Sequence, residues 1–300
     1  MKQSVRLPAF AKINLCLHVI GRRPDGYHEL RTIFQAIGLH DTLELRRTKS
    51  SQITLEIEGA ELSAGPDNLV YRAIEAIGCK IGYRGGVHTR LEKRIPVARG
   101  LGGGSSDAAA ALIGMLRLTG ARLPLAALME IASSLGADVP FFLFGGRALA
   151  VNRGDEIYPL SDAPKQTILV VSPKDVGVST KEAYQWVSEE LTKRQEPPKI
   201  WGFCALCWSR QGAGVSNDFE GPVFRRHPRL GEIRAGLLQG GAADAALAGS
   251  GSAVFGVFRN PARARRTARK FPEDSVFVVP TLSRKEYGRA LGWRAAEVFS

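Results

Sequence analysis

The sequence lacks any long hydrophobic run and contains few cysteines. No stretch of uncharged apolar residues approaches the roughly 18 that a membrane-spanning helix needs. The N-terminal segment carries Lys12, Asn14 and His18 where a secretion signal would have an apolar core. Only 4 cysteines occur in 300 residues, and they are scattered along the chain. Scattered cysteines are typical of reduced thiols, so we predict a cytoplasmic protein that does not enter the membrane.

Two cysteines do lie close together, Cys204 and Cys207 in C-A-L-C. One such pair supplies at most half of a zinc site, and Cys16 and Cys79 are far away in sequence. The flanking Trp and Phe residues favour apolar packing of this pair over metal binding. No protein ligand of a metal is assigned.

Acidic residues are outnumbered by basic ones, 29 against 41, which gives a net charge of +12. A positive chain favours anionic partners, which could be nucleotides or nucleic acid. The segments 84–86, 225–229 and 265–270 could contact phosphates. They lack the interleaved aromatic residues that stack on RNA bases. A nucleic-acid-binding protein is therefore the alternative from another functional class, and we predict no nucleic-acid partner.

Residues 96–107, P-V-A-R-G-L-G-G-G-S-S-D, are followed by an apolar run at 108–118 that predicts a helix. A glycine-rich loop at a helix N-terminus offers free N–H groups and the positive end of the helix dipole, which suits a phosphate. No Lys follows the last glycine, so the common P-loop pattern is absent. The alternative is a flexible turn that Ser105 or Ser106 caps.

Near the N-terminus, apolar residues alternate from Ile13 to Val19, which predicts a strand. On this pattern Lys12, Asn14, Cys16 and His18 share the other face. The turn R-P-D-G at 23–26 then leads into Tyr27 and His28. The alternatives are a solvated lysine and an ordinary strand aromatic.

Asp138 lies in L-G-A-D-V-P-F-F-L-F, between a helix that ends at Gly136 and an apolar run. Ionised carboxylates seldom lie among such residues without a partner. Asp138 is either the N-cap of a short turn or the partner of a buried cation, for which Lys12 is the obvious candidate.

The remaining pattern predicts a mixture of strands and helices without a strict βαβ rhythm, which favours an α+β fold. A linker is expected at 161–164, S-D-A-P. Strands are expected at 11–20, 28–38, 41–47, 52–58, 86–94, 166–173, 253–258 and 276–280, and a hairpin at 147–160 that turns at Arg153 and Gly154. Helices are expected at 67–78, 108–118, 124–135, 180–191, 228–238 and 261–270.

Taken together, these segments resemble the galactokinase–homoserine kinase–mevalonate kinase–phosphomevalonate kinase (GHMP) superfamily of small-molecule kinases. The resemblance rests on A-K-I-N-L-C-L-H-V-I-G-R-R-P-D-G-Y-H-E-L, on the loop and on L-G-A-D-V-P-F-F-L. It extends to N-D-F-E at 217–220 and A-G-S-G-S-A-V-F-G at 248–256. Phe10 stands where a small residue is expected, and residues 190–215 match nothing in the family.

The resemblance implies a two-domain GHMP-kinase fold, with a ribosomal-protein-S5-like N-terminal domain at 1–160 and a ferredoxin-like C-terminal domain at 161–300. It implies phosphoryl transfer from ATP, with Mg²⁺, to an alcohol bound in the cleft between them. The first and third segments resemble most closely the members whose substrate is the C2 hydroxyl of a cytidine diphosphate methylerythritol. A kinase of the homoserine or mevalonate type is the alternative within the family. The chain is expected to be a monomer or homodimer.

The resemblance also implies roles for particular residues. Asp138 would be the general base and Lys12 its catalytic partner. Tyr27 and His28 would recognise cytosine, Asn14 would contact substrate or orient Lys12, and Tyr184 is a second candidate stacking ring, with a core aromatic as its alternative. Ser105 is the best candidate to meet the magnesium ion. The ATP-binding residues would be Pro96, Val97, Ala98, Arg99, Gly100, Leu101, Gly102, Gly103, Gly104, Ser105 and Ser106.

Overall fold

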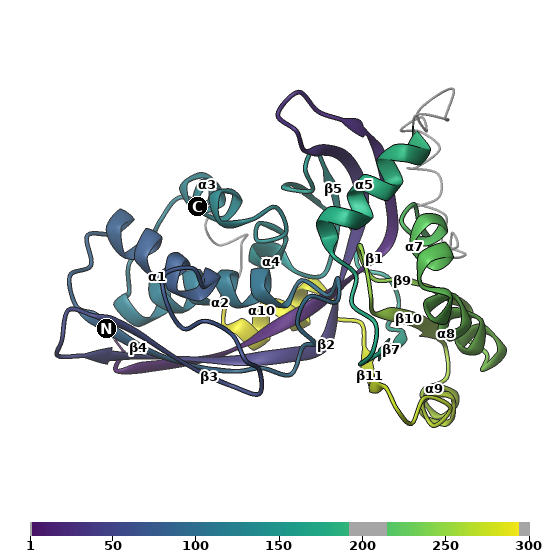
Figure 1. The fold of residues 1–300 in the computed structure, drawn as a ribbon. Helices are drawn as coiled ribbons and strands as arrows, with labels where there is room; N and C mark the ends of the chain where they lie inside the picture. Colours follow the sequence, from purple (N-terminus) through teal and green to yellow (C-terminus); the bar gives the residue numbers. More distant parts are fainter. Residues whose placement is uncertain (1, 192–214, 294–300) are drawn as a thin grey trace.

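The computed structural model describes residues 2–191 and 215–293. Two sheets organise the chain, and helices cover each of them (Figure 1). The predicted α+β class is therefore confirmed. None of the helices in these two ranges is long and apolar enough to span a membrane.

The first sheet is built on a long antiparallel pair, β1 (Ser4–Arg22) and β2 (His28–Thr48). Its order is β3-β4-β2-β1-β8, and off this path β5 pairs with β2 and β6 pairs with β5. The further strands are β3 (Ile53–Glu58), β4 (Gly86–Glu92), β5 (Arg147–Val151), β6 (Glu156–Pro159) and β8 (Ser216–Asn217).

Four helices complete this half: α1 (Leu69–Lys80), α2 (Gly103–Thr119), α3 (Leu125–Leu135) and the short α4 (Phe141–Phe144). Figure 1 shows α1, α2 and α3 on one side of the sheet. The Ala-rich sequence of α2 lets it pack against β1 and β2 while it also contacts α1 and α3. Its Gly114 is closely covered by Leu45, since a Cβ there would lie 2.6 Å from a Leu45 methyl carbon. The helix that carries the glycine-rich loop is thus held firmly in a core.

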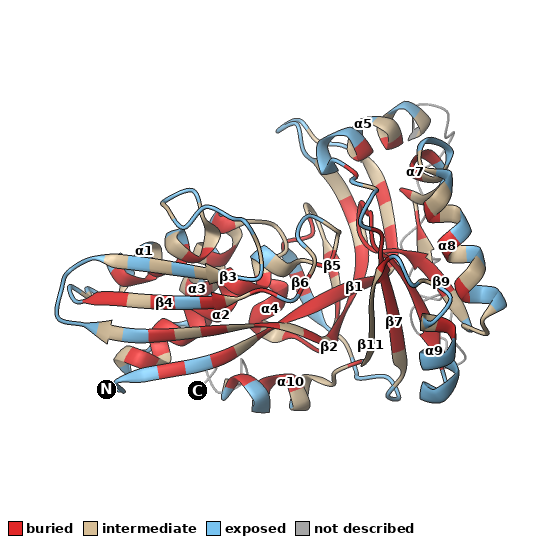
Figure 2. Cartoon of the chain, turned by 60° about the horizontal axis from the view of Figure 1, so that its bottom comes forward, coloured by how far each residue is buried: buried red, intermediate tan, exposed pale blue. Residues whose placement is uncertain are grey.

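The second sheet has the antiparallel order β11-β7-β10-β9, with β7 (Thr167–Ser172), β9 (Asp244–Leu247), β10 (Val254–Phe258) and β11 (Ser275–Pro280). The helices of this half are α5 (Thr180–Leu191), α7 (Glu220–Arg226), α8 (Pro228–Gln239) and α9 (Pro261–Ala268). Buried residues run along β1 and through this sheet (Figure 2). One apolar cluster joins Ile13 and Ile37 of the first sheet to Val170 and Phe255 of the second. The two sheets therefore share a core.

The last helix, α10 (Arg284–Leu291), returns to the first half. Tyr287 is buried there and donates its hydroxyl to the carbonyl of Phe142 at 2.7 Å, and Trp293 donates to the carbonyl of Leu143 at 2.9 Å. The domain boundary between residues 160 and 161 stays a prediction. Helix α10 belongs to the C-terminal part of the sequence, but it packs against the N-terminal half.

Two local predictions were wrong. The strands expected at 28–38 and 41–47 form one strand, because Gly38 stays extended and gives room to Pro280, whose Cδ would lie 3.0 Å from a Cβ there. The simple alternation along β1 also fails, since the pairing with β2 shifts between Asn14 and Cys16. Such a shift breaks the period of two. As a result Leu17, and neither Cys16 nor His18, lines a cavity with Lys12.

Candidate active site

The glycine-rich loop runs between two cavities, and Gly100, Gly102 and Ser105 border both. Gly100 and Gly102 have φ values of 78° and 72°, in the region that favours glycine. A Cβ on Gly100 would overlap the carbonyl oxygen of Ala248. The sequence is rich in glycine here because the backbone of the loop passes directly against the segment that precedes β10.

The loop leads into α2, whose N-cap is Gly102 and which has no side-chain capping bond. Ser105 and Ser106 lie inside the first turn, so the alternative in which they cap a flexible turn is wrong. The Ser106 hydroxyl is buried and has no hydrogen-bond partner in the described part of the chain. The first N–H groups of a helix have no partner within the helix, and they add to the positive end of the dipole. This end of α2 is therefore suited to an anion.

A buried charge cluster fixes the approach to this loop. Lys93, the residue after β4, pairs with Asp41 of β2, and its Nζ lies 2.7 Å from Oδ2 of Asp107 in α2. Asp41 also accepts hydrogen bonds from the backbone N–H groups of Arg94 and Ile95. Burial raises the pKa of Asp107 to about 8, although the Lys93 charge opposes the shift. Burial lowers the pKa of Lys93, but the charges of Asp107 and Asp41 outweigh it and the net shift is upward.

The smaller cavity, of about 400 Å³, lies on the Lys93 side of the loop. Its other wall comes from the start of α1 and the segment before it, including Leu62, Asn68 and Leu69. It reaches from the exposed Val97 to the first turn of α2. Every residue of the predicted ATP-binding loop from Pro96 to Ser105 lines it, whereas Ser106 does not. The loop thus combines a cavity whose volume lies in the range of small-molecule sites with an end suited to an anion.

The larger cavity, of about 900 Å³, lies on the other side of the loop and contains Lys12 and Asp138. Lys12 Nζ is 3.4 Å from Asp138 Oδ2, so the predicted pairing is present. Asp138 follows the C-cap Gly136 of α3, and α4 begins after Pro140 without a side-chain cap, so the N-cap alternative is wrong.

Lys12 is nearly buried, with 5% of its side chain exposed, so the alternative of a solvated lysine is also wrong. It donates to Asn14 Oδ1 at 2.8 Å, and Asn14 Nδ2 in turn donates to Thr32 Oγ1 at 2.7 Å. Its ammonium lies 5.0 Å from the centre of the Phe34 ring. A cation held this way presents its charge at one fixed place in the cavity.

The far end of the larger cavity is aromatic. His28 stacks on Tyr184 with ring centres 4.8 Å apart, and Tyr184 meets Phe219 edge-on at 4.9 Å. His28 Nε2 lies 2.7 Å from Ser188 Oγ. Burial, helped by the charge of Arg22, lowers the pKa of His28, so its imidazole is neutral near pH 7. Tyr27 stands at the rim with 57% of its surface exposed.

Tyr184 thus lines the cavity and also packs against the core of the second half. Both interpretations of this residue describe part of its surroundings.

Sequence reasoning did not assign several lining residues: Arg22, Arg153, Thr180, Lys181, Phe219 and Ser250. Phe219 and Ser250 lie in the two C-terminal segments already noted, and Asn217 explains how these segments meet. Its side-chain amide donates to the carbonyls of Leu247 and Gly249 at 2.9 and 2.7 Å. Nothing in the sequence around Asn217 indicated that its side chain would contact residues 247 and 249. Arg153 was placed only as part of a hairpin turn.

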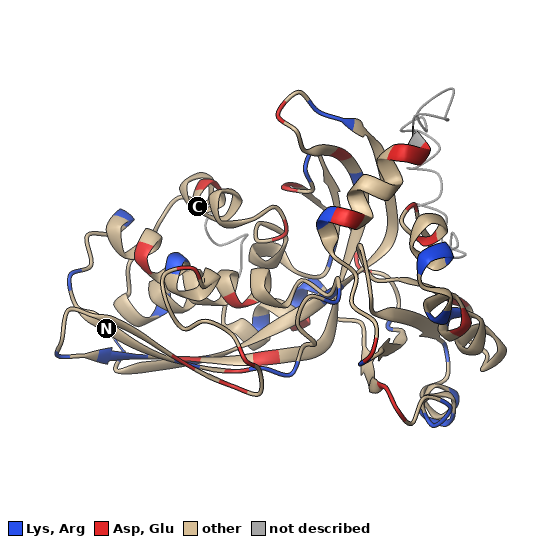
Figure 3. Cartoon of the chain, viewed as in Figure 1, with Lys and Arg blue, Asp and Glu red and all other residues tan. Residues whose placement is uncertain are grey.

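No group of three or more His, Cys, Asp or Glu side chains suited to a metal occurs within residues 2–191 and 215–293. Cys204 and Cys207 lie outside these ranges. The basic segment 225–229 is largely neutralised by acidic neighbours: Arg225 pairs with Glu190, Arg226 with Glu189, and Arg229 with Asp274 and Asp175. Figure 3 shows basic residues gathered on α9 and otherwise interspersed with acidic ones.

The comparisons with known proteins agree with this arrangement. Residues 68–146 match the GHMP kinases N terminal domain, and residues 200–275 match the GHMP kinases C terminal domain. The fold is that of a GHMP kinase, an ATP-dependent small-molecule kinase. A homoserine kinase structure from Cytophaga hutchinsonii, 18% identical with a TM-score of 0.68, shares the fold over 94% of this chain and 96% of its own.

Closer relatives narrow the assignment. A 4-diphosphocytidyl-2-C-methyl-D-erythritol kinase of Solibacter usitatus is 45% identical over 97% of this chain and 92% of its own. One from Pelotomaculum thermopropionicum is 41% identical over 92% and 97%. A crystal structure of 4-(cytidine 5'-diphospho)-2C-methyl-D-erythritol kinase is 36% identical with a TM-score of 0.78, covering 92% of this chain and 99% of that one. The chain belongs to the 4-diphosphocytidyl-2-C-methyl-D-erythritol kinase family.

Proposed function

We propose that this protein transfers the γ-phosphoryl group of ATP to the C2 hydroxyl of 4-diphosphocytidyl-2-C-methyl-D-erythritol. The products are ADP and the 2-phosphate, within the non-mevalonate pathway to isoprenoid precursors. The observation that carries the proposal is the position of the Lys12–Asp138 pair. It lies in the cavity that joins the glycine-rich loop to the aromatic end with Tyr27 and His28. A phosphate donor and an alcohol with a nucleobase could therefore meet at this pair.

Phosphoryl transfer asks a protein mainly for positioning and charge stabilisation. Asp138 accepts the proton of the substrate hydroxyl while the hydroxyl oxygen attacks the γ-phosphorus. The bond between the γ-phosphorus and the oxygen that bridges it to the β-phosphorus breaks, and ADP leaves with that oxygen. Lys12 pairs with Asp138 and stabilises the negative charge that develops on the attacking and transferring oxygens. Asn14 holds the lysine ammonium in place. The geometry supports these roles, because the three side chains lie within hydrogen-bond or ion-pair distance of one another in one cavity.

The ATP phosphates lie along the loop from Pro96 to Ser106, against the N–H groups that begin α2. Mg²⁺ accompanies ATP and shields the charge of the phosphates. Magnesium usually takes one or two protein oxygens together with phosphates and water. The Ser105 hydroxyl would fit this need, because Ser105 borders both cavities and the larger one contains Asp138. Ser105 would then be the protein contact of the ion.

The cytosine base lies at the aromatic end. Tyr27 stacks on it from the rim, His28 as a neutral imidazole hydrogen-bonds its polar edge, and Tyr184 extends the aromatic wall behind His28. Base stacking of this kind is worth about 1–3 kcal/mol per base. Because the donor is ATP, we expect the protein to act in the cytoplasm. We expect it to be a monomer or a homodimer.

The test is ADP release by the purified protein with Mg-ATP and 4-diphosphocytidyl-2-C-methyl-D-erythritol, run beside homoserine and mevalonate. Turnover of the cytidylyl alcohol alone is the expected result. Turnover of homoserine or mevalonate instead would retain the ATP site and refute the substrate. Absence of turnover with all three, together with RNA binding that survives physiological salt, would favour the nucleic-acid alternative.

A further inference from the structure

The Tyr27 ring is exposed, but one of its faces is covered by a cation. Arg153, in the turn between β5 and β6, places its guanidinium carbon 5.1 Å from the ring centre. Among the described residues this is the one ring-face contact that Tyr27 makes. Both side chains line the larger cavity. An arginine from a distant hairpin thus meets the residue expected to stack on the base.

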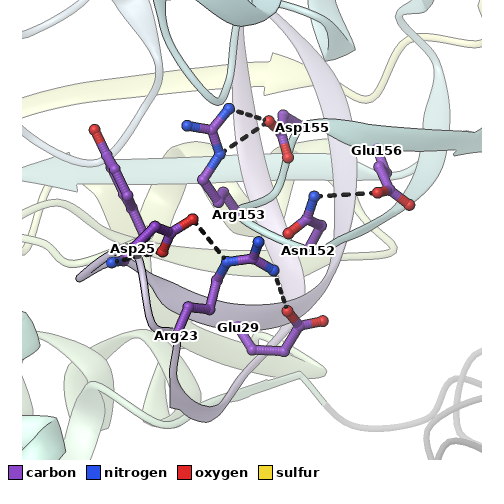
Figure 4. A network of polar contacts seen from close by, with 8 residues as sticks. Arg23, Asp25, Glu29, Asn152, Arg153, Asp155 and Glu156 are labelled. Atoms are coloured by element: carbon purple, nitrogen blue, oxygen red, sulfur yellow. Dashed lines mark hydrogen bonds and ion pairs between the residues drawn. The ribbon is translucent and has the colours of Figure 1, made fainter.

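The guanidinium of Arg153 is itself anchored. Its Nε and Nη2 donate to Asp155 Oδ2 at 3.1 and 2.6 Å, and Asp155 is buried (Figure 4). The turn is fixed to the first sheet because the N–H of Leu30 donates to the carbonyl of Asn152 at 2.7 Å. Asn152 has a φ of 63°, which asparagine tolerates better than most residues. Arg153 therefore has little freedom to leave Tyr27.

The backbone of Tyr27 is also held, by the turn that precedes it. The N–H of Tyr27 donates to Asp25 Oδ1 at 3.1 Å, and its carbonyl accepts from the N–H of Arg23 at 2.8 Å. The Arg23 side chain bridges Asp25 at 3.2 Å and Glu29 at 2.9 Å (Figure 4). These contacts fix where the side chain starts, but they do not fix the direction of the ring.

We propose that Arg153 is a positioning residue, which holds the Tyr27 ring in the orientation that stacks on the cytosine base. The inference rests on the proposed function. An exposed aromatic side chain samples several rotamers, and selecting one of them on binding weakens affinity. A guanidinium stacked on one face favours one rotamer before the ligand arrives and leaves the other face free for the base. At exposed sites such a contact accounts for about a 2- to 5-fold change in affinity.

The experiment compares Arg153→Ala with the wild-type protein by calorimetric titration of cytidine and of cytidine 5'-diphosphate. Cytidine carries no phosphate, so it separates a positioned ring from a direct contact between Arg153 and phosphate. We expect both ligands to bind the variant 2- to 5-fold more weakly. The factor should be the same for the two ligands. In the kinase assay KM for the cytidylyl substrate should rise by that factor while kcat is unchanged.

Arg90→Ala is the matched control. Arg90 is an exposed arginine of β4 that pairs with Glu58 of β3, and its loss should change neither affinity. In Arg153→Ala the buried carboxylate of Asp155 loses its cation. The double variant Arg153→Ala/Asp155→Asn removes that carboxylate as well and should bind both ligands with the same affinity as Arg153→Ala. In a Tyr27→Leu background, Arg153→Ala should have no further effect, because there is no ring left to position.

Weakening of cytidine 5'-diphosphate alone would overturn the inference and make Arg153 a phosphate contact. Unchanged binding of both ligands, or full additivity with Tyr27→Leu, would also refute it. If the wild-type protein binds neither ligand and does not turn over the cytidylyl alcohol, the proposed function fails and the inference falls with it.

Discussion

The Lys12 ammonium lies 3.4 Å from the Asp138 carboxylate, yet the two side chains differ sharply in exposure, 5% against 33%. Lys12 comes from the middle of β1, where Phe34 and the loop cover its stem. Asp138 comes from the short connection between α3 and α4 and opens into the larger cavity. A substrate hydroxyl can therefore approach the carboxylate of Asp138. Of Lys12, only the ammonium group can contact the substrate.

Asp138→Asn keeps the size of the side chain and removes its basicity. We expect kcat to fall by about 10²–10⁴, because loss of a positioned general base has that effect. The free energy of unfolding should change little, since Asp138 is partly exposed. Steady-state ADP release and urea unfolding measure the two quantities. Retention of more than a tenth of the wild-type kcat would show that Lys12 polarises the hydroxyl without help from a base.

Much of the site could be predicted because its parts are local. The loop 96–106 is recognisable from its glycines, and Asp138 from an isolated charge in an apolar segment. The pairing of Lys12 with Asp138 was predicted because an ionised carboxylate in an apolar segment needs a partner, for which Lys12 was the obvious cation. The signals of the loop and of Asp138 are each contained in a dozen residues or fewer.

The contacts that could not be predicted depend on the register of distant strands. The shift in pairing between Asn14 and Cys16 turns Leu17 toward the cavity, and no residue at this point signals a bulge. The approach of Arg153 to Tyr27 requires the β5–β6 hairpin to pair beside β2, which only the assembled sheet specifies. The buried cluster of Lys93 with two aspartates was missed for the same reason.

Tyr27→Ala should chiefly raise KM for the cytidylyl substrate. Loss of one stacking ring is expected to raise it about 5- to 100-fold while KM for ATP stays the same, since stacking is worth about 1–3 kcal/mol. The ring is exposed at the rim, so folding should be unaffected. Tyr158→Ala, which removes another exposed tyrosine, is the control. An unchanged KM in Tyr27→Ala would place the base elsewhere.

Lys93→Met and Asp107→Asn should have unequal effects on stability. Removal of the lysine leaves two carboxylates buried without their cation, and breaking such a pair is expected to lower the free energy of unfolding by about 3–5 kcal/mol. Burial raises the pKa of Asp107, so its charged form is the costly one in this cluster, and Asn removes that charge while keeping the size of the side chain. We therefore expect Asp107→Asn to be much less harmful in urea unfolding. Equal losses would mean that Asp107 is needed as an anion.

Gly100→Ala and Gly82→Ala separate the space around a glycine from its backbone angle. Both residues have positive φ, 78° and 68°, but a Cβ at Gly82 meets nothing within 4 Å whereas one at Gly100 meets the Ala248 carbonyl. Gly82→Ala should lower stability by about 1–2 kcal/mol through backbone strain alone. Gly100→Ala should lose a further 1–3 kcal/mol or so by overpacking and should raise KM for ATP as the loop shifts. Similar behaviour of the two variants would show that the loop yields without consequence.

His18 should make stability depend on pH above neutrality. Its Nδ1 lies 3.4 Å from Asp218 Oδ1, and that carboxylate, with the Cys16 thiol, raises its pKa from 6.5 to about 9. A group whose pKa is higher in the folded state stabilises fully below its unfolded pKa, and the contribution disappears as pH rises through the folded pKa.

We therefore expect the His18 contribution to be complete near pH 6 and to be lost between about pH 6.5 and 9. Urea unfolding of the wild-type protein and of His18→Gln across this range measures it, because the difference between them cancels the other titrating groups. That difference should shrink as pH rises. A difference that is constant with pH would mean that His18 is neutral in the folded protein over this range.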